Sequence, residues 1–257
     1  MLVDITDPEL VERVAHDPRG RSLGAVVNSA GVAVNAPAEA IPLDEWRRHF
    51  DVNFFGHVAV SQVLLSALFA DGDGRLVNIS SIGGRVAFPT YGAYAAAKFA
   101  VEWVSDVVRR EVARYGVKII VIEPGTVATA MWDKGIATMV TLAATMTSEQ
   151  HARYDDLIAA MDKQSRQQAG TEIQPTQVAK VIAGAIQSRE PRTRYLVGRD
   201  AKLLAGVSRL LSDRMIDRLV ARSLRIAKPA NPRRAHAQAR AYPGSSSRLM
   251  RCRMGGG

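Results

Sequence analysis

Short apolar runs rich in valine and isoleucine alternate along the chain with longer segments in which apolar residues recur every three or four positions. The short runs predict β-strands, and the longer segments predict amphipathic helices. Consecutive apolar positions within a run are typical of parallel strands covered by helices on both faces. The predicted strands are MLVDI at 1–5, LGAVVNSAG at 23–31, GRLVNISS at 74–81, VKIIVIEPG at 117–125 and RYLVG at 194–198.

The predicted helices lie between these strands, so the order of elements indicates crossover connections and an α/β fold. Asp7 is the expected N-cap of the first helix, and Pro8 takes its first position, where proline is tolerated. The pattern between 126 and 170 is irregular and helical. The other predicted helices cover 7–15, 43–69, 90–115 and 175–188, and 201–224 forms one or two more.

Charge divides the chain into two parts. Residues 226–257 contain seven lysines and arginines and no acidic residue, so residues 1–225 carry only +2 of the formal net charge of +9. The same segment is rich in proline, glycine and serine and has no apolar period, which predicts disorder. We therefore expect one domain at 1–225 and a basic tail at 226–257, either an inert extension or a weak binder of polyanions.

Composition also limits the class of protein. No run of about 18 apolar residues is present, so no membrane span is expected. The N-terminus has two early acids and no basic region, so no signal peptide is expected. The single cysteine, Cys252, excludes an internal disulfide framework and fits the cytoplasm. We expect no specific nucleic-acid partner, because the basicity is confined to the tail, and we assign no metal ligands.

Three predicted strands end in segments that suit a ligand. These segments are NSAG at 28–31, the two serines at 80–81 and EPGTVAT at 123–129. Ligands of open parallel sheets bind in the crevice beyond the carboxyl ends of the strands. The convergence therefore predicts a binding site at this edge of the sheet.

Tyr94 and Lys98 are four residues apart on a predicted helix, so they share one face. A nearby ammonium favours the phenolate and lowers the pKa of a tyrosine, which could then exchange a proton with a substrate oxygen. The competing interpretation is a packed tyrosine beside a solvated lysine. Tyr91 has alanine at the corresponding position and lacks such a partner.

Other candidates also have two interpretations. The hydroxyl of Ser81 could bond a substrate oxygen or satisfy a turn. Asn53, a poor helix former within a predicted helix, could hold a water near the site or lie on an exposed face. Asn28, Ala30 and Gly31 would let the backbone approach a flat ligand, but small residues also suit a tight turn.

Together, these segments resemble the short-chain dehydrogenase/reductase family. NSAG, Asn53, NISS, YAAAK and PGTVAT occur in the order and spacing of that family, over residues 1 to about 200. The resemblance implies a Rossmann-like, doubly wound parallel sheet. It also implies an oxidoreductase that transfers hydride between NAD or NADP and a secondary alcohol or ketone.

The resemblance implies a role for each candidate. Tyr94 would be the general acid/base, and Lys98 would lower its pKa and hold the nicotinamide ribose. Ser81 would orient the substrate oxygen, and Asn53 would anchor a water in a proton relay toward Lys98. Asp4 and Ile5 would contact the adenine side. The remaining implied cofactor contacts are Asn28, Ala30, Gly31, Pro124, Gly125, Val127 and Thr129, together with Tyr94 and Lys98.

One departure from the family concerns the N-terminal region. The family begins with a strand and the turn T-G-x-x-x-G-x-G, which receives the pyrophosphate at a helix N-terminus. This chain has no such motif, and MLVDI matches the third family strand. We therefore expect an N-terminally truncated sheet that lacks the first two strands and exposes an apolar edge. The alternative function is a non-catalytic pseudoenzyme or interaction protein that cannot bind the dinucleotide.

The segment after PGTVAT and the two long helices suggest the partners. Apolar side chains at Met131, Trp132, Met139, Leu142 and Met146 either favour a hydrophobic alcohol or ketone or pack a lid on itself. The family assembles through the helices predicted at 43–69 and 90–115. A homodimer or homotetramer is therefore expected.

Overall fold

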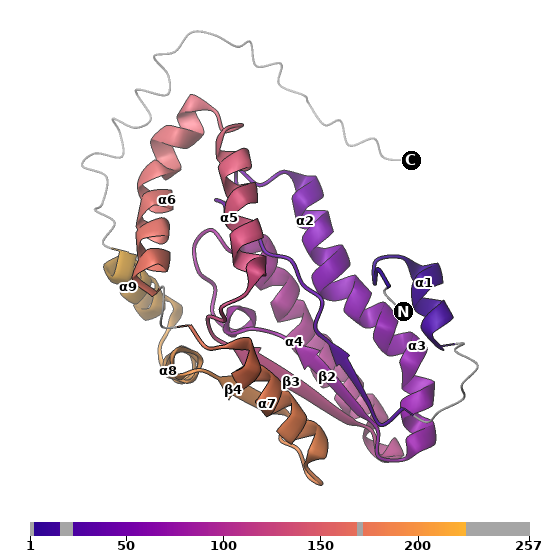
Figure 1. Cartoon of the computed structure of the whole chain (residues 1–257). Coiled ribbons are helices and arrows are strands. Elements are labelled where there is room, and N and C mark those ends of the chain that lie inside the picture. The colour runs from indigo at the N-terminus through magenta and orange to yellow at the C-terminus, as the bar shows by residue number, and fades with distance from the viewer. Residues whose placement is uncertain (1–2, 16–22, 169–171, 225–257) are drawn as a thin grey trace, which may run out of the picture. The chain divides into compact units, whose positions relative to one another are not determined.

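The computed structural model describes residues 3–15, 23–168 and 172–224, and it has a parallel β-sheet with helices on both faces (Figure 1). The strands are β1 Ala25–Asn28, β2 Arg75–Ile79, β3 Lys118–Pro124 and β4 Arg194–Val197. They pair in the order β1-β2-β3-β4, and every pair is parallel. Four of the five predicted strands and the predicted sheet type are therefore confirmed.

Side chains that alternate along the strands build two apolar layers. Val26 and Leu76, which are register partners, pack on one face in a cluster with helix residues such as Leu68. Val77 and Ile120 point to the other face. Helices α3 (Gly56–Asp71) and α4 (Gly92–Val112) supply the first cluster, and α7 (Pro175–Gln187) supplies the second (Figure 1). The predicted doubly wound arrangement is confirmed.

The predicted helices are also present. The helix predicted at 43–69 consists of α2, a π-helical turn at Asp51–Phe55, and α3. The side chain of Asp7 caps α1 by accepting the backbone N–H groups of Glu9 and Leu10 at 3.0 and 3.2 Å. The remaining helices are α1 Pro8–Ala15, α2 Leu43–Phe50, α5 Ala130–Ala143, α6 Ser148–Gln168, α8 Arg199–Leu210 and α9 Asp213–Leu224.

The strand predicted at MLVDI is wrong for its described residues. Val3 and Asp4 have no regular secondary structure, and Ile5 and Thr6 form a turn in which the carboxylate of Asp4 accepts the backbone N–H of Thr6 at 2.9 Å. An isolated extended segment leaves its backbone groups without partners, and an aspartate side chain offers a local alternative. The first two residues and the predicted tail at 226–257 lie outside the described residues.

Strand β1 forms one end of the described sheet. It pairs with β2 along one side, and its residue Val27 remains 40% exposed. An apolar strand edge of this kind is open to further pairing. The exposed edge expected at LGAVVNS is therefore present among the described residues.

The continuous helical run Leu43–Asp71 is, by length and composition alone, apolar enough to cross a membrane. The sequence pattern had not predicted a span. The same run, however, carries the buried polar residues Asn53 and His57, both of which bond to the segment after β1. Its residues Leu64 and Leu68 lie in the core beside the sheet. These contacts are those of a core helix of the α/β domain.

Candidate active site

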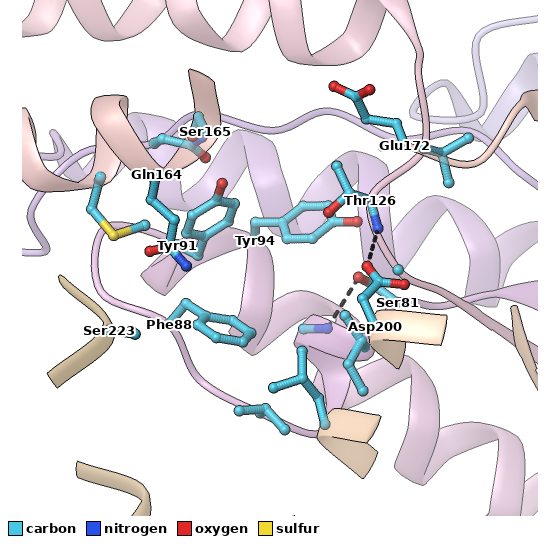
Figure 2. Close-up of a pocket in the computed structure, with 18 of the residues that line it drawn as sticks. Ser81, Phe88, Tyr91, Tyr94, Thr126, Gln164, Ser165, Glu172, Asp200 and Ser223 are labelled. Atoms are coloured by element: carbon cyan, nitrogen blue, oxygen red, sulfur yellow. Dashed lines mark hydrogen bonds between the residues drawn. The ribbon is translucent and has the colours of Figure 1, made fainter. Parts of the chain in front are cut away.

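A cavity of about 1000 Å³ lies beyond the carboxyl ends of the strands. Ser81, at the end of β2, and Tyr94, in the first turn of α4, both line it. The segment after β3 forms another part of the wall. Figure 2 shows Ser81, Tyr94, Thr126 and Asp200 grouped together, with Tyr91 and Ser165 farther along the cavity. Two of the three predicted strand-end segments therefore meet at this cavity, and NSAG at 28–31 is not among the residues that line it.

Tyr94 is almost fully buried, with 6% of its surface exposed. Burial raises the pKa of its phenol, and a hydrogen bond with the Ser81 hydroxyl acts in the opposite direction. The Ser81 oxygen also accepts the backbone N–H of Gly83 at 3.0 Å, which fixes its position. The two hydroxyl groups therefore lie together in the cavity wall, where both could bond one substrate oxygen.

Lys98 is buried on the same face of α4, one turn after Tyr94. Its Nζ donates to the carbonyl oxygen of Ile79 at 2.8 Å and lies 5.9 Å from the centroid of the Tyr94 ring. Burial lowers the pKa of Lys98 to about 8, while the charge of Glu102 opposes this shift. In this structure Ser81, and not Lys98, opposes the rise in the tyrosine pKa. The predicted tuning of Tyr94 by Lys98 stays a prediction.

Asn53 lies in the π-helical turn and is fully buried. Its side chain accepts the backbone N–H of Val32 and donates to the carbonyl of Val32, both at 2.9 Å. The exposed-face interpretation is therefore wrong, because the amide holds the segment after β1. Its predicted role in a water relay stays a prediction. Single π-helical turns of this kind are frequent at functional sites.

Gly31 marks a small gap between four elements. A Cβ atom at this position would lie 3.2 Å from Oδ1 of Asn53 and 3.9 Å from both Nζ of Lys98 and Sδ of Met131. A side chain here would press on the amide of Asn53, so close packing alone already favours glycine at this position. The predicted contact of Gly31 with the cofactor stays a prediction.

Residues just before Gly31 are tied to α3. The carbonyl of Ala30 accepts a hydrogen bond from Nε2 of His57 at 2.8 Å. Burial, and then the charge of Lys98, lowers the pKa of His57 to about 4, so the neutral ring donates through this nitrogen. The buried amide of Asn28 faces Ser61 and Asn78, at 3.1 and 2.8 Å, behind the strand ends. Its predicted contact with the cofactor stays a prediction.

The segment after β3 carries the other predicted cofactor contacts. Gly125, Val127 and Thr129 line the cavity, whereas Pro124 is buried at the end of the strand. Asp4 and Ile5 are not among the residues that line the cavity, and Ile5 packs against Gly56 of α3. The predicted contacts of these residues with the nicotinamide and adenine ends of the cofactor stay predictions.

A buried ionic cluster supports the site from behind. Nε of Arg194 lies 2.9 Å from the carboxylate of Glu102 and 3.3 Å from that of Glu123, and Nη1 of Arg194 lies 3.0 Å from Asp106. Arg85 pairs with Glu123 at 2.6 Å. Burial and the neighbouring Glu123 raise the pKa of Glu102. Glu123 lies on β3 two residues before the cavity residue Gly125, and the cluster joins β3, β4 and α4.

Sequence analysis missed two kinds of cavity residue. Asp200 accepts the backbone N–H of Thr126, and it follows the strand RYLVG, so the rule about strand ends could have identified it. Leu219 and Val220 of α9 also line the cavity, but no local pattern placed this helix there. Among the described residues, no group of three or more His, Cys, Asp or Glu side chains could hold a metal ion.

Comparison with known proteins identifies the family of the chain. A family model described as short chain dehydrogenase matches residues 1–139. The NADPH-dependent 3-dehydrocapnine reductase of Ornithobacterium rhinotracheale is 30% identical over 233 residues, covering 88% of this chain and 80% of the relative. Retinol dehydrogenase 5 of Mus musculus is 34% identical over 228 residues, covering 84% and 70%. A short-chain dehydrogenase structure from Burkholderia cenocepacia, in complex with NADP, has a TM-score of 0.64 and 25% identity, covering 86% and 76%.

These matches agree with the sheet and the cavity described above. The family model covers more than half of the chain, and the reductase aligns along most of both sequences. The resemblance expected from NSAG, NISS, YAAAK and PGTVAT is confirmed. The chain belongs to the short-chain dehydrogenase family of NAD(P)-dependent oxidoreductases.

Proposed function

We propose that the chain reduces a hydrophobic ketone to a secondary alcohol, and catalyses the reverse oxidation, with Tyr94 as the general acid/base. The observation that carries this proposal is the pair of hydroxyl groups, Tyr94 and Ser81, in the wall of a cavity of about 1000 Å³. Paired hydroxyls aimed at one point stabilise the charge that develops on a carbonyl oxygen during reduction.

The nicotinamide supplies or accepts the hydride when it is bound. In our proposal, Gly31 and Lys98 hold its ring and ribose on one side, and Gly125, Val127 and Thr129 border the other. Ser81 donates a hydrogen bond that orients the substrate oxygen. Tyr94 donates its phenolic proton to that oxygen as the alcohol forms. Lys98 lies one helical turn away, where its amine can pass on a replacement proton.

The environment of Tyr94 favours the reductive direction. Burial raises the pKa of its phenol, so the group carries its proton at neutral pH. A protonated tyrosine is ready to act as an acid, whereas oxidation of an alcohol requires the phenolate. We therefore propose that ketone reduction is faster than alcohol oxidation near pH 7, and that oxidation gains as the pH rises.

The substrate class follows from the rest of the cavity. Its wall is largely apolar, with Val86, Phe88, Ile136, Met161 and Leu204 among the lining residues. Such a lining favours a ketone with an extended hydrocarbon part, because each buried CH₂ contributes about 0.8 kcal/mol. One relative named above is a dehydrocapnine reductase and another is a retinol dehydrogenase; retinol is a primary alcohol, so it agrees with the proposed hydrocarbon part and not with the proposed ketone.

A titration followed by kinetics tests the proposal. NADPH and NADH would be titrated into the purified 1–257 chain, with nicotinamide fluorescence as the readout of binding. The oxidation of whichever dinucleotide binds would then be followed with ketones of increasing alkyl length. Y94F and S81A should keep binding and lose at least about 100-fold in turnover, the usual contribution of an acid/base group and of a hydrogen-bond donor to the developing charge, respectively. Y115F alters an exposed tyrosine elsewhere and is the matched control. Equal turnover in Y94F and the wild type would contradict the assignment.

A non-catalytic protein is the second candidate, and one observation favours it. The sequence has no glycine-rich turn, and Ile5 packs on α3 instead of bordering the cavity. In that case neither dinucleotide binds at micromolar concentration. Saturable binding followed by turnover excludes this candidate, and the absence of binding with both dinucleotides favours it.

We also propose that the protein is cytoplasmic. Two copies of the chain associate, in our proposal, through α3 and α4. Phe99, Trp103 and Val107 recur every four residues along α4, and each is about half exposed; Phe55 beside α3 is exposed as well. A second copy would bury this apolar stripe. Sedimentation of W103E as a monomer, with the wild type as a dimer or tetramer, supports association through this face. Unchanged assembly of W103E contradicts it.

A further inference from the structure

The segment at 125–129 after β3, which we call the β3–α5 segment, is attached to the start of α8. The backbone N–H of Gly125 donates to the carbonyl of Val197 at 2.8 Å. One residue later, the backbone N–H of Thr126 donates to Oδ2 of Asp200 at 2.9 Å. Figure 2 shows this bond beside Ser81 and Tyr94. Two consecutive N–H groups are therefore held by residues more than 70 positions later in the chain.

Two glycines make room for the carboxylate of Asp200. A Cβ atom at Gly125 would overlap this group, which supplies all three of the atoms nearest to it. A Cβ atom at Gly198 would also overlap Oδ1 of Asp200, and Gly198 has a φ of +108°, a conformation that favours glycine. Both ends of the contact thus lack side chains where the carboxylate lies.

We propose that Asp200 is a positioning residue that holds the β3–α5 segment at the distance from Tyr94 and Ser81 that the reaction requires. Asp200 does not touch the reacting atoms in this role. It fixes the backbone at Thr126, and Val127 and Thr129, the proposed nicotinamide contacts, follow directly. A displacement of about 1 Å in such a wall lowers the rate of a hydride-transfer enzyme strongly, because the two reactants must be aligned.

The chemistry of the contact predicts which substitutions matter. A carboxylate is a strong acceptor for a backbone N–H. The side chain of asparagine has the same length, and its amide oxygen accepts the same bond more weakly, so D200N should keep the attachment. D200A has no acceptor and should lose the attachment. The inference rests on the proposed oxidoreductase function for its catalytic consequence, whereas the attachment itself can be measured without any reaction.

The test combines amide hydrogen exchange with NADPH binding and kinetics on the full chain. In D200A the Thr126 N–H should exchange at least about tenfold faster, and the Kd for NADPH and the KM for ketone should rise by about tenfold, the effect of losing one charge-assisted hydrogen bond. D200N should stay within about threefold of the wild type. D213A removes the acidic residue in the first turn of α9 and is the matched control for the loss of a helix N-terminal charge.

The outcomes separate this inference from the proposed function. Faster exchange and weaker binding in D200A, restored in D200N and absent in D213A, support the positioning role. Unchanged exchange and binding in D200A overturn it. If the wild type neither binds NADPH nor reduces ketones, the proposed function fails, and exchange at Thr126 alone still decides whether Asp200 holds the segment. If D200A does not fold, G125A displaces the same carboxylate and should accelerate the same exchange.

Discussion

Replacement of Lys98 by methionine should make the folded chain more stable while removing a residue of the proposed site. Lys98 is buried, and burial lowers its pKa from the ordinary 10.5 to about 8. The charged amine is therefore disfavoured in the folded state. At about 1.36 kcal/mol per pKa unit, the difference corresponds to about 3 kcal/mol of lost stability at neutral pH.

Methionine also removes a favourable contact. The amine of Lys98 donates to the carbonyl of Ile79 at 2.8 Å, and the variant leaves that carbonyl without this donor. Loss of one hydrogen bond costs about 1 kcal/mol. The expected net gain for K98M is therefore about 2 kcal/mol near pH 7.

The pH dependence gives the sharper test. A lysine whose pKa is lowered by folding destabilises the protein fully below the folded pKa of about 8. As the pH rises from about 8 toward 10.5, the folded protein loses the proton first, and the destabilisation disappears. The advantage of K98M over the wild type should thus shrink by about 2 to 3 kcal/mol between pH 7 and pH 10.

Urea denaturation at pH 7, 8, 9 and 10, followed by tryptophan fluorescence, measures these differences. K163M on α6 replaces an exposed lysine, so it lacks the burial penalty and serves as the matched control. A free-energy difference between K98M and the wild type that stays constant over this pH range would refute the reasoning. K98M that is less stable than the wild type at pH 7 would refute it as well.

Three further perturbations follow from buried contacts. Burial lowers the pKa of His57 from 6.5 to about 4. The stability that the neutral His57 ring contributes is therefore complete above pH 6.5 and is lost as the pH falls toward 4. Relative to H57Q, the free energy of unfolding of the wild type should fall by about 2 to 3 kcal/mol between pH 7 and pH 4.5, measured by urea denaturation. R194A leaves the carboxylate of Glu102 buried without its cationic partner and should lower the free energy of unfolding by about 3 to 5 kcal/mol, whereas R194K should lower it less. G116A puts a Cβ atom into the carbonyl of Gly72 at a φ of +80°, and its Tm should fall by several degrees, whereas an alanine at Gly184, where nothing lies within 4 Å, should leave the Tm unchanged or higher.

Long periodic segments allowed most of the fold to be predicted. The run VKIIVIEPG at 117–125 has apolar residues on both faces, and it became β3, which is covered on both sides. MLVDI carries a similar local signal but no described strand. A strand requires a neighbour that takes up its N–H and C=O groups, and this requirement concerns the whole sheet. Local pattern alone therefore could not decide between strand and turn at residues 3–5.

The chemistry of single residues was less predictable than their proximity. The spacing of Tyr94 and Lys98 correctly put both on one buried face of α4. The lysine amine, however, bonds to Ile79 on β2, a partner that only the packing of α4 on the sheet determines. Asp200 shows the same limit, since its acceptor role depends on a contact 74 residues away.

The wall of the site beside β1 depends on helix side chains more than on the sheet. β1 has β2 along one side, so the segment that follows it receives less support from strand pairing than the ends of β2 and β3. Asn53 and His57 supply this support by bonding the backbone of Val32 and Ala30. The β3–α5 segment combines both kinds of support, because Asp200 on α8 accepts the N–H of Thr126 while Gly125 and Ala128 bond to the backbone of Val197 and Ile173. The segment after β1 thus depends most on two polar side chains of the helical run Leu43–Asp71, and changes in this run should move that segment before they alter the sheet.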